Sequence, residues 1–187
     1  MVFSCPKNCS IIFVSLSLFL LIDAQAIHVN FDDDGPADLC PKTRNSTFCF
    51  QIIGSFGNDS FMEMMKAAIK SASQLAELAA DQARELLIQG KYPALNDQLK
   101  SCIGNYTQTN LDLFTMQRDL KAGYYDSLPP EANAVLADAG ACDSQFQPPS
   151  SEPAEVKKGT QDLLDACSLV LVVSQIVYEP SRVEPDS

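Results

Sequence analysis

The chain has 187 residues and a formal net charge of −11, because 24 aspartates and glutamates outnumber 13 lysines and arginines. This acidic balance opposes binding to nucleic acids and to anionic membranes, and it favours a basic partner. Once the N-terminal segment described next is set aside, the remaining length suits one domain with a single core.

Residues 1–26 have the organisation of a secretory signal peptide. Lys7 precedes an apolar run from Ile11 to Ile22, and Ala24-Gln25-Ala26 forms a small-x-small cleavage pattern. The run is 12 residues long, well short of the ~20 that span a bilayer. We therefore expect cleavage after Ala26, secretion, and no membrane association of the mature chain. An uncleaved anchor is the alternative, because Asp23 interrupts the passage from the apolar run to the cleavage pattern.

The cysteines and the glycosylation motifs agree with an oxidising secretory route. Cys5 and Cys9 leave with the signal peptide, and the mature chain keeps Cys40, Cys49, Cys102, Cys142 and Cys167. This odd number predicts two disulfides and one free thiol, and four bridged cysteines allow three connectivities. N-x-S/T acceptors for N-linked glycans begin at Asn45, Asn58 and Asn105.

The segment from residue 27 to 38 is acidic and broken by Gly35-Pro36, so we expect a mobile arm with the fold starting near Leu39. Residues 39–60 predict a shorter helical extension. From Phe61 to Leu87, apolar or small residues recur at steps of three and four, which predicts an amphipathic helix ending at Gly90. Its expected buried stripe is Met62, Met65, Ile69, Ala72, Ala76, Ala79, Ala83 and Leu86.

The same spacing predicts a second long helix from Leu95 to Leu120, which ends at Gly123. Its stripe is Leu95, Leu99, Cys102, Tyr106, Thr109, Leu113, Met116 and Leu120. Pro129-Pro130 opens a third, shorter helix. The side of this helix that we expect to be buried carries Val135, Leu136, Ala139, Cys142 and Phe146.

The last periodic segment carries Val156, Leu163, Cys167, Val170, Ser174 and Val177 on one stripe. Its second half is apolar nearly all round, which predicts the most buried helix of the fold. A strand is the alternative for SLVLVVSQIV, but the chain offers no partner strand and Pro180 ends the run. The sum is an all-α fold, an antiparallel four-helix bundle with an N-terminal helical extension, over residues 39–179 and with a tail at 180–187.

The residue types that catalysis requires are sparse. His28 is the single histidine and falls in the expected arm, which argues against a metal site or a Ser-His-Asp relay. Cys40 and Cys49 lack the spacing and companion ligands of a zinc site, and no glycine-rich phosphate loop occurs. The carboxylate pair Glu77 and Asp81 is typical of a solvated helix face. We therefore expect no enzyme activity, no cofactor and no metal.

Five stretches together resemble the plant invertase and pectin methylesterase inhibitors. They are LCPKTRNSTFC at 39–49, LKSCIGNY at 99–106, AGYYDSL at 122–128, ADAGACDSQF at 137–146 and LLDACSLVLVVSQIV at 163–177. The resemblance implies a disulfide from Cys40 to Cys49 that closes a helical hairpin. It also implies a second from Cys102 to Cys142 between bundle helices, and a free Cys167.

The resemblance further implies a secreted cell-wall protein of the apoplast that has no catalytic activity and occludes the substrate cleft of an enzyme. Invertase inhibitors often carry P-K-F between the third and fourth bundle helices. The string GYYDSL at 123–128 looks closer to the pectin methylesterase inhibitors of fruit. Pectin methylesterase is the expected partner and acid invertase the alternative. Ser101, Gly104, Gln108 and Ala141 depart from residues common in the family, which bears on affinity and target range.

The outward faces of the first three bundle helices are the expected contact surface. We expect Glu77 and Asp81 on one helix, with Asn105, Gln108 and Asp112 on its neighbour, to contact the enzyme. A second hypothesis is a carrier whose core holds an apolar ligand among Met62, Met65, Met116 and Phe114. A third is a structural or signalling secreted bundle.

Overall fold

A computed structural model describes residues 35–58, 60–146 and 151–178, which lie in one compact unit over residues 33–187. The expected signal peptide at 1–26, residues 27–34 of the expected arm and the tail at 180–187 lie outside the described residues. The described part of the chain contains helices and turns and no β-strand. The all-α prediction is therefore confirmed.

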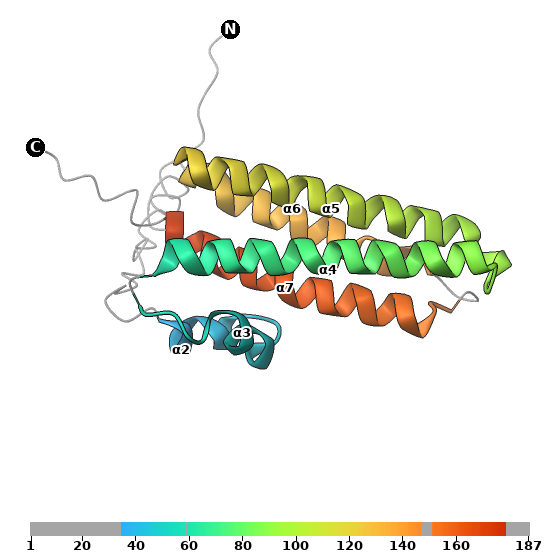
Figure 1. Ribbon diagram of the computed structural model, residues 1–187, viewed down its shortest axis with the longest axis horizontal. Helices are drawn as coiled ribbons and strands as arrows, with labels where there is room; N and C mark the ends of the chain where they lie inside the picture. The colour runs from blue at the N-terminus through green and yellow to red at the C-terminus, as the bar shows by residue number, and fades with distance from the viewer. Residues whose placement is uncertain (1–34, 59, 147–150, 179–187) are drawn as a thin grey trace, which may run out of the picture. The chain divides into compact units, whose positions relative to one another are not determined.

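Four long helices form the bundle (Figure 1). They are α4 (Phe61–Gln89), α5 (Asn96–Ala122), α6 (Leu128–Gly140) and α7 (Ala154–Tyr178). Consecutive helices run in opposite directions, so the topology is up-down-up-down. Helix α4 packs against α5 and α7, and α6 packs against the same two helices. The pairs α4/α6 and α5/α7 are thus the diagonals of the bundle.

The first two bundle helices follow the predicted stripes closely. On α4 the fully or nearly buried residues include Met65, Ile69 and Ala72, but Met62 is half-buried and Met64 is buried instead. On α5 the predicted stripe is buried from Leu99 to Leu120, whereas Leu95 is half-buried and precedes the helix. The stripe positions at the outer ends of the helices are less covered, because fewer neighbouring residues surround a helix end.

Glycines end both helices as the sequence predicts. Gly90 and Gly123 have φ angles of 61° and 82°, in the left-handed region. Gly90 N donates to the Leu86 and Leu87 carbonyls, which closes α4. Residues with a Cβ are strained in this conformation, so glycine is the residue that allows a helix to stop and the chain to turn within a few residues.

Helix α7 is the core helix of the bundle, and the helix prediction for SLVLVVSQIV is confirmed. All six residues of its predicted stripe are buried. Among the described helices, α7 alone is long and apolar enough to cross a membrane, with a mean hydropathy of 1.4 in its most apolar window. In that window 72% of the residues are buried inside the protein, which is typical of a helix at the centre of a bundle.

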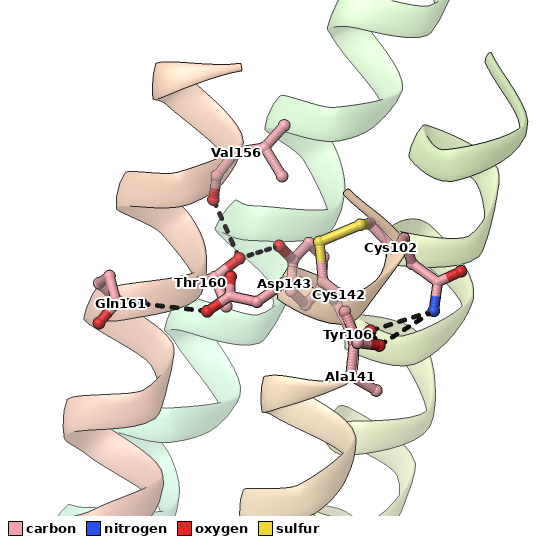
Figure 2. Close-up of a disulfide and its surroundings, with 10 residues drawn as sticks. Cys102, Tyr106, Ala141, Cys142, Asp143, Val156, Thr160 and Gln161 are labelled. Carbon is pink, nitrogen blue, oxygen red and sulfur yellow. Dashed lines mark hydrogen bonds between the residues drawn. A yellow bond between two sulfur atoms is a disulfide. The ribbon is translucent and has the colours of Figure 1, made fainter. Parts of the chain in front are cut away.

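Helix α6 is shorter than expected, because it ends at Gly140 and Cys142 follows in the turn before the 3-10 helix η6 (Asp143–Gln145). Leu136 is half-buried rather than buried. Cys142 is nevertheless fully buried and forms the disulfide with Cys102 of α5, with a Cα–Cα distance of 4.7 Å (Figure 2). The second disulfide therefore joins α5 to the turn after α6.

The N-terminal boundary predicted near Leu39 is wrong by a few residues. A short helix α2 (Pro36–Leu39) begins the described fold, and both Pro36 and Leu39 are buried. Proline fits the first turn of a helix, where its missing N–H has no intrahelical partner. The interpretation of residues 35–38 as part of a mobile arm overlooked this start signal and the apolar surface that Pro36 covers.

The helical extension comprises α2, the 3-10 helix η3 (Cys40–Lys42) and α3 (Ser46–Ile53). The disulfide between Cys40 and Cys49 closes it, with a Cα–Cα distance of 5.3 Å. Helix α3 packs against α4 and α7. The Arg44 backbone N–H donates to Ser168 Oγ of α7 at 3.0 Å, and the guanidinium Nη2 donates to Gln161 Oε1 at 2.8 Å. Polar contacts therefore fasten the extension to the bundle.

Candidate functional site

The helices α4 and α5 enclose a surface hollow of about 340 Å³. Small residues of α4 allow the helices to approach at its floor, and polar side chains form its walls. The lining residues are Ala76, Glu77, Ala80, Asp81, Arg84, Tyr106, Thr107 and Asn110. Glu77 and Asp81, two of the predicted contact residues, thus lie in one recess of the bundle surface.

The charged side chains of this hollow are tied to neighbours. Asn110 Nδ2 of α5 donates to Glu77 Oε1 of α4 at 3.3 Å, which joins the two helices across the recess. Arg84 Nη1 pairs with Asp81 one turn away on α4. The ion pair is exposed, so its net contribution to stability is small. The hollow therefore presents the carboxylate of Glu77 and, at Asp81, a carboxylate whose charge Arg84 partly compensates.

Gln108 and Asp112 lie on the other flank of α5, toward α6. Gln108 Nε2 donates to Asp112 Oδ1 at 2.9 Å, one turn along the same helix. Asp112 is half-buried. Burial, followed by the interaction with Asp112, raises the pKa of the Asp138 carboxyl on α6. The structure therefore separates Gln108 and Asp112 from the hollow that holds Glu77 and Asp81.

The side chain of Asn105 is unsuited to the two roles that the sequence predicts for it, attachment of an N-linked glycan and contact with the enzyme. The residue is half-buried, and its amide Nδ2 is buried without a hydrogen-bond partner. An N-linked glycan is attached through this nitrogen, so the described rotamer has no room for one. Partner contact through the same amide also requires the side chain to turn outward. Asn105 lies on the side of α5 that faces α6, and this position explains the burial of its amide. The N-x-T motif gives no information about burial.

The other two glycosylation candidates differ from each other. Asn45 caps α3, because its Oδ1 accepts from Phe48 N at 3.0 Å, and its Nδ2 donates to Asp165 Oδ2 of α7 at 2.8 Å. Asn45 is half-buried, and its amide helps to hold the extension against α7. Asn58 is exposed in the connection between α3 and α4.

Two apolar residues on α5 were missed as surface features. The side chains of Leu111 and Phe114 are 56% and 66% exposed. They follow Asn110, which lines the hollow, by one and four residues. Residues 110 and 114 are one turn apart and share a side of the helix. The carrier hypothesis placed Phe114 in the core, and this placement is wrong. Their positions off the buried stripe were the signal in the sequence that could have identified them.

Neither a reactive thiol nor a metal cluster is present among the described residues. Cys167 is free and fully buried on α7, and burial raises the pKa of its thiol to about 12. A neutral, inaccessible thiol is a poor nucleophile. No three His, Cys, Asp or Glu side chains in the described ranges are grouped so that they could hold a metal ion.

Similarity to known proteins agrees with this architecture. The family model for plant invertase/pectin methylesterase inhibitors matches residues 35–173. A pectinesterase inhibitor from Actinidia deliciosa is 28% identical over 175 residues, which cover 90% of this chain and 94% of that protein.

Two solved structures share the fold. One is a mutant form of a pectin methylesterase inhibitor from Arabidopsis, with a TM-score of 0.68, 19% identity, and coverage of 75% of this chain and 95% of that chain. The other is a pectin methylesterase inhibitor from Arabidopsis thaliana, with a TM-score of 0.59, 20% identity, and coverage of 74% and 92%. The family match over residues 35–173 shows that the chain belongs to the plant invertase/pectin methylesterase inhibitor family, whose members are inhibitor proteins rather than enzymes.

Proposed function

We propose that this chain is a secreted inhibitor of pectin methylesterase in the plant cell wall, which binds the enzyme and occludes its substrate cleft. The family match over residues 35–173 carries the proposal. The similarity to a pectinesterase inhibitor over nearly the whole chain favours this target over acid invertase. The carrier alternative is not favoured, because Phe114 is exposed while Met65 and Met116 are fully buried.

The α4–α5 face is the proposed contact surface. The hollow offers the Glu77 and Asp81 carboxylates to basic groups of the enzyme, and Leu111 with Phe114 adds exposed apolar area beside it. Apolar anchors that become desolvated dominate binding energy in most interfaces, while rim charges mainly raise the association rate. We therefore assign affinity to the apolar pair and salt-dependent steering to the carboxylates.

A pair of double variants tests this division. Leu111→Ala with Phe114→Ala should weaken inhibition of pectin methylesterase by about tenfold or more, mainly through faster dissociation. Glu77→Ala with Asp81→Ala should slow association with a basic enzyme and flatten its dependence on ionic strength. Methanol release from pectin gives the inhibition, and surface plasmon resonance gives the two rates.

Two control variants show whether a loss of inhibition is specific to the α4–α5 face. They remove an exposed apolar side chain and an exposed acid elsewhere on α4. Ile88→Ala removes an apolar side chain that is 79% exposed on α4 but does not line the hollow. Glu63→Ala removes one exposed acid near the start of α4. Both controls should inhibit like the unaltered protein. Full inhibition by the Leu111 and Phe114 double variant would remove the proposed anchor.

The target is tested with unaltered protein that begins at Ile27. Parallel assays with pectin methylesterase and with acid invertase should show inhibition of the first enzyme only. Inhibition of invertase alone would assign the chain to the alternative target. Secretion is tested by expressing the full chain in plant cells and sequencing the N-terminus of the extracellular protein, which should begin at Ile27.

The departures from the family pattern can tune affinity. Gly104 and Gln108 are exposed on α5, and a Cβ added at Gly104 meets no atom within 4 Å. Gly104→Asp therefore restores an acidic residue without a steric clash and replaces glycine inside a helix. We expect faster association with a basic methylesterase from this variant, while Gly104→Ala serves as the control for helix propensity.

A further inference from the structure

The hollow between α4 and α5 has an apolar floor and polar walls. Ala76 and Ala80 of α4 form the floor, and both are buried. Tyr106 of α5 lines the same recess, but its hydroxyl is bonded to Thr160 of α7, as Figure 2 shows. The volume of about 340 Å³ lies within the range of ~300–1,000 Å³ that is typical of small-molecule sites. The recess therefore has room for a short apolar stem with a polar head.

The neutral polar groups of the walls use donors within the protein. Asn110 Nδ2 donates to Glu77 Oε1 at 3.3 Å, and Thr107 Oγ1 donates to the Ile103 carbonyl at 2.7 Å. The amide oxygen of Asn110 and the lone pairs of the Thr107 hydroxyl stay available as acceptors. The carboxylates of Glu77 and Asp81 can only accept while they are ionised. A ligand that satisfies these walls must therefore supply hydrogen-bond donors.

The hollow carries a negative charge. Two carboxylates and one guanidinium line it, which leaves a formal charge of −1. The guanidinium of Arg84 is paired with Asp81, one turn away on α4. No cation in the described part of the chain forms an ion pair with Glu77. The net charge of −11 on the whole chain adds to the attraction of cations and to the repulsion of anions.

These features favour one chemical class of ligand over two others. A sugar acid such as galacturonate carries the same sign of charge as the walls. A neutral sugar commonly packs against an exposed aromatic face, but the aromatic residue of this recess, Tyr106, is fully buried. An ammonium or guanidinium group on a few methylene carbons supplies N–H donors, positive charge and an apolar stem together.

We propose that the α4–α5 hollow is a binding site for an organic cation that carries N–H donors on a short apolar stem, an alkylammonium or alkylguanidinium group. The stem lies over Ala76 and Ala80, and the cationic head binds Glu77, with Asn110 and Thr107 as further acceptors. A free amine and a lysine or arginine side chain of a partner protein present the same chemistry. Only the second source rests on the proposed function.

A titration of the free protein tests the site without any enzyme, so its outcome is independent of the proposed function. Isotope-labelled protein that begins at Ile27 is titrated with n-butylammonium and followed by amide NMR. Saturable shifts should gather at residues 76–81 of α4 and 106–110 of α5. The dissociation constant should be about 1–10 mM, as expected for a ligand of so few atoms.

Three probes separate the properties of the ligand. Tetramethylammonium has charge but no N–H donor, n-butanol has the stem but no charge, and galacturonate is an anion. Because a hydrogen bond to a charged group is stronger than one between neutral groups, each probe should bind about tenfold or more weakly than n-butylammonium at equal ionic strength. Equal binding of n-butylammonium and tetramethylammonium would overturn the proposal.

Two variants and a control locate the site. Glu77→Gln keeps the shape of the hollow, removes one charge and should weaken n-butylammonium binding about tenfold. Thr107→Leu keeps every charge and places a larger apolar side chain at an exposed position of the wall, so it should weaken binding by excluding the stem. Glu63→Gln removes an exposed acid outside the hollow and should bind like the unaltered protein. All three positions are exposed, so the variants should fold, and their amide spectra check this.

Inhibition assays identify the source of the cation. When a side chain of pectin methylesterase occupies the hollow, n-butylammonium should weaken inhibition at fixed ionic strength and tetramethylammonium should not. Unchanged inhibition, with n-butylammonium bound in the NMR titration, assigns the site to a free amine. The absence of saturable shifts at the hollow, or full binding by both the Glu77 and the Thr107 variants, would show that the hollow is not a cation site.

Discussion

The hydroxyls of Tyr106 and Thr160 lie 2.6 Å apart in the bundle core. They join α5 to α7, the two helices of one diagonal, and both side chains are fully buried. Thr160 Oγ1 also donates to the Val156 carbonyl at 3.1 Å, as Figure 2 shows. Burial raises the pKa of Tyr106 to about 12, so its hydroxyl remains protonated and can donate to Thr160.

This geometry predicts an asymmetry between two conservative substitutions. Thr160→Val leaves the Tyr106 hydroxyl buried without a partner and should cost about 1–3 kcal/mol of unfolding free energy. Tyr106→Phe leaves Thr160 bonded to the Val156 carbonyl and should cost about 1 kcal/mol or less. Urea unfolding at a fixed pH measures both. A larger loss from Tyr106→Phe would contradict this account of the diagonal hydrogen bond.

The two disulfides should differ in their effect on stability. The bridge from Cys102 to Cys142 closes 40 residues and that from Cys40 to Cys49 closes nine. On the chain-entropy model, their removal by paired serine substitutions costs about 4 and about 2.7 kcal/mol. Chemical unfolding of the two double variants measures the difference. Retention of α3 packing in the Cys40 and Cys49 variant would show that the contacts to α7 suffice to hold the extension.

The hydrogen bond between Asn45 and Asp165 should control docking of the extension. Asn45→Asp keeps an oxygen that can cap α3 but places a carboxylate against Asp165, with Arg44 as the nearby cation. The expected result is faster proteolysis within α3, with the bundle intact. Asp165→Asn in the same chain removes the repulsion and should restore resistance. Equal protease resistance of the Asn45→Asp variant and the unaltered protein would show that other contacts dominate docking.

The sequon at Asn105 should remain unmodified in the folded protein. Its Nδ2 is buried, whereas Asn58 is exposed. Expression through a eukaryotic secretory pathway, followed by glycopeptide mass spectrometry, should give a glycan at Asn58 and none at Asn105. Asn58→Gln should then abolish the mass shift at Asn58, while Asn105→Gln should leave the glycan pattern unchanged. A folded, glycosylated Asn105 would mean that α5 and α6 separate enough to admit a sugar.

Cys167 should be chemically silent in the native state. Its thiol is fully buried and its pKa is raised to about 12 by burial. Protein that begins at Ile27, and thus lacks Cys5 and Cys9, should show no reaction with a disulfide reagent at pH 8. In denaturant one thiol per chain should react. Rapid native reaction would point to opening of α7 on the timescale of the assay, and Cys167→Ser identifies the reacting group.

The spacing of apolar residues was enough to predict the bundle helices. A helix that buries one face needs apolar residues at steps of three and four, whichever helices cover that face. The stripes from Ile69 to Leu86 and from Leu99 to Leu120 are buried as their spacing predicts, and Gly90 and Gly123 end the helices through a backbone conformation specific to glycine. The resemblance added the disulfide pairing, which spacing alone left open. The start of the fold at Pro36 was missed, because the acidic composition of residues 27–38 indicated a mobile arm and a single proline was the sole signal for a helix start.

Helical spacing predicted the candidate site less well than it predicted the helices. Glu77 and Asp81 were placed correctly on one surface, but the structure puts Asp112 against Asp138 and buries the amide of Asn105. Phe114, assigned to a ligand-binding core, is exposed. Helical spacing specifies which side of its own helix a residue occupies. Which neighbouring helix covers that side depends on the rotation and packing of two helices.

The sequence by itself therefore determined the secretory pattern, the helices and the family resemblance, which all follow from local composition, periodicity and short motifs. Tertiary structure decided which residues of α4 and α5 line one hollow, which asparagine amides are buried and which apolar side chains of α5 are exposed. These features depend on the approach of residues far apart in the chain, where burial, hydrogen bonding and charge change with a few ångströms of separation.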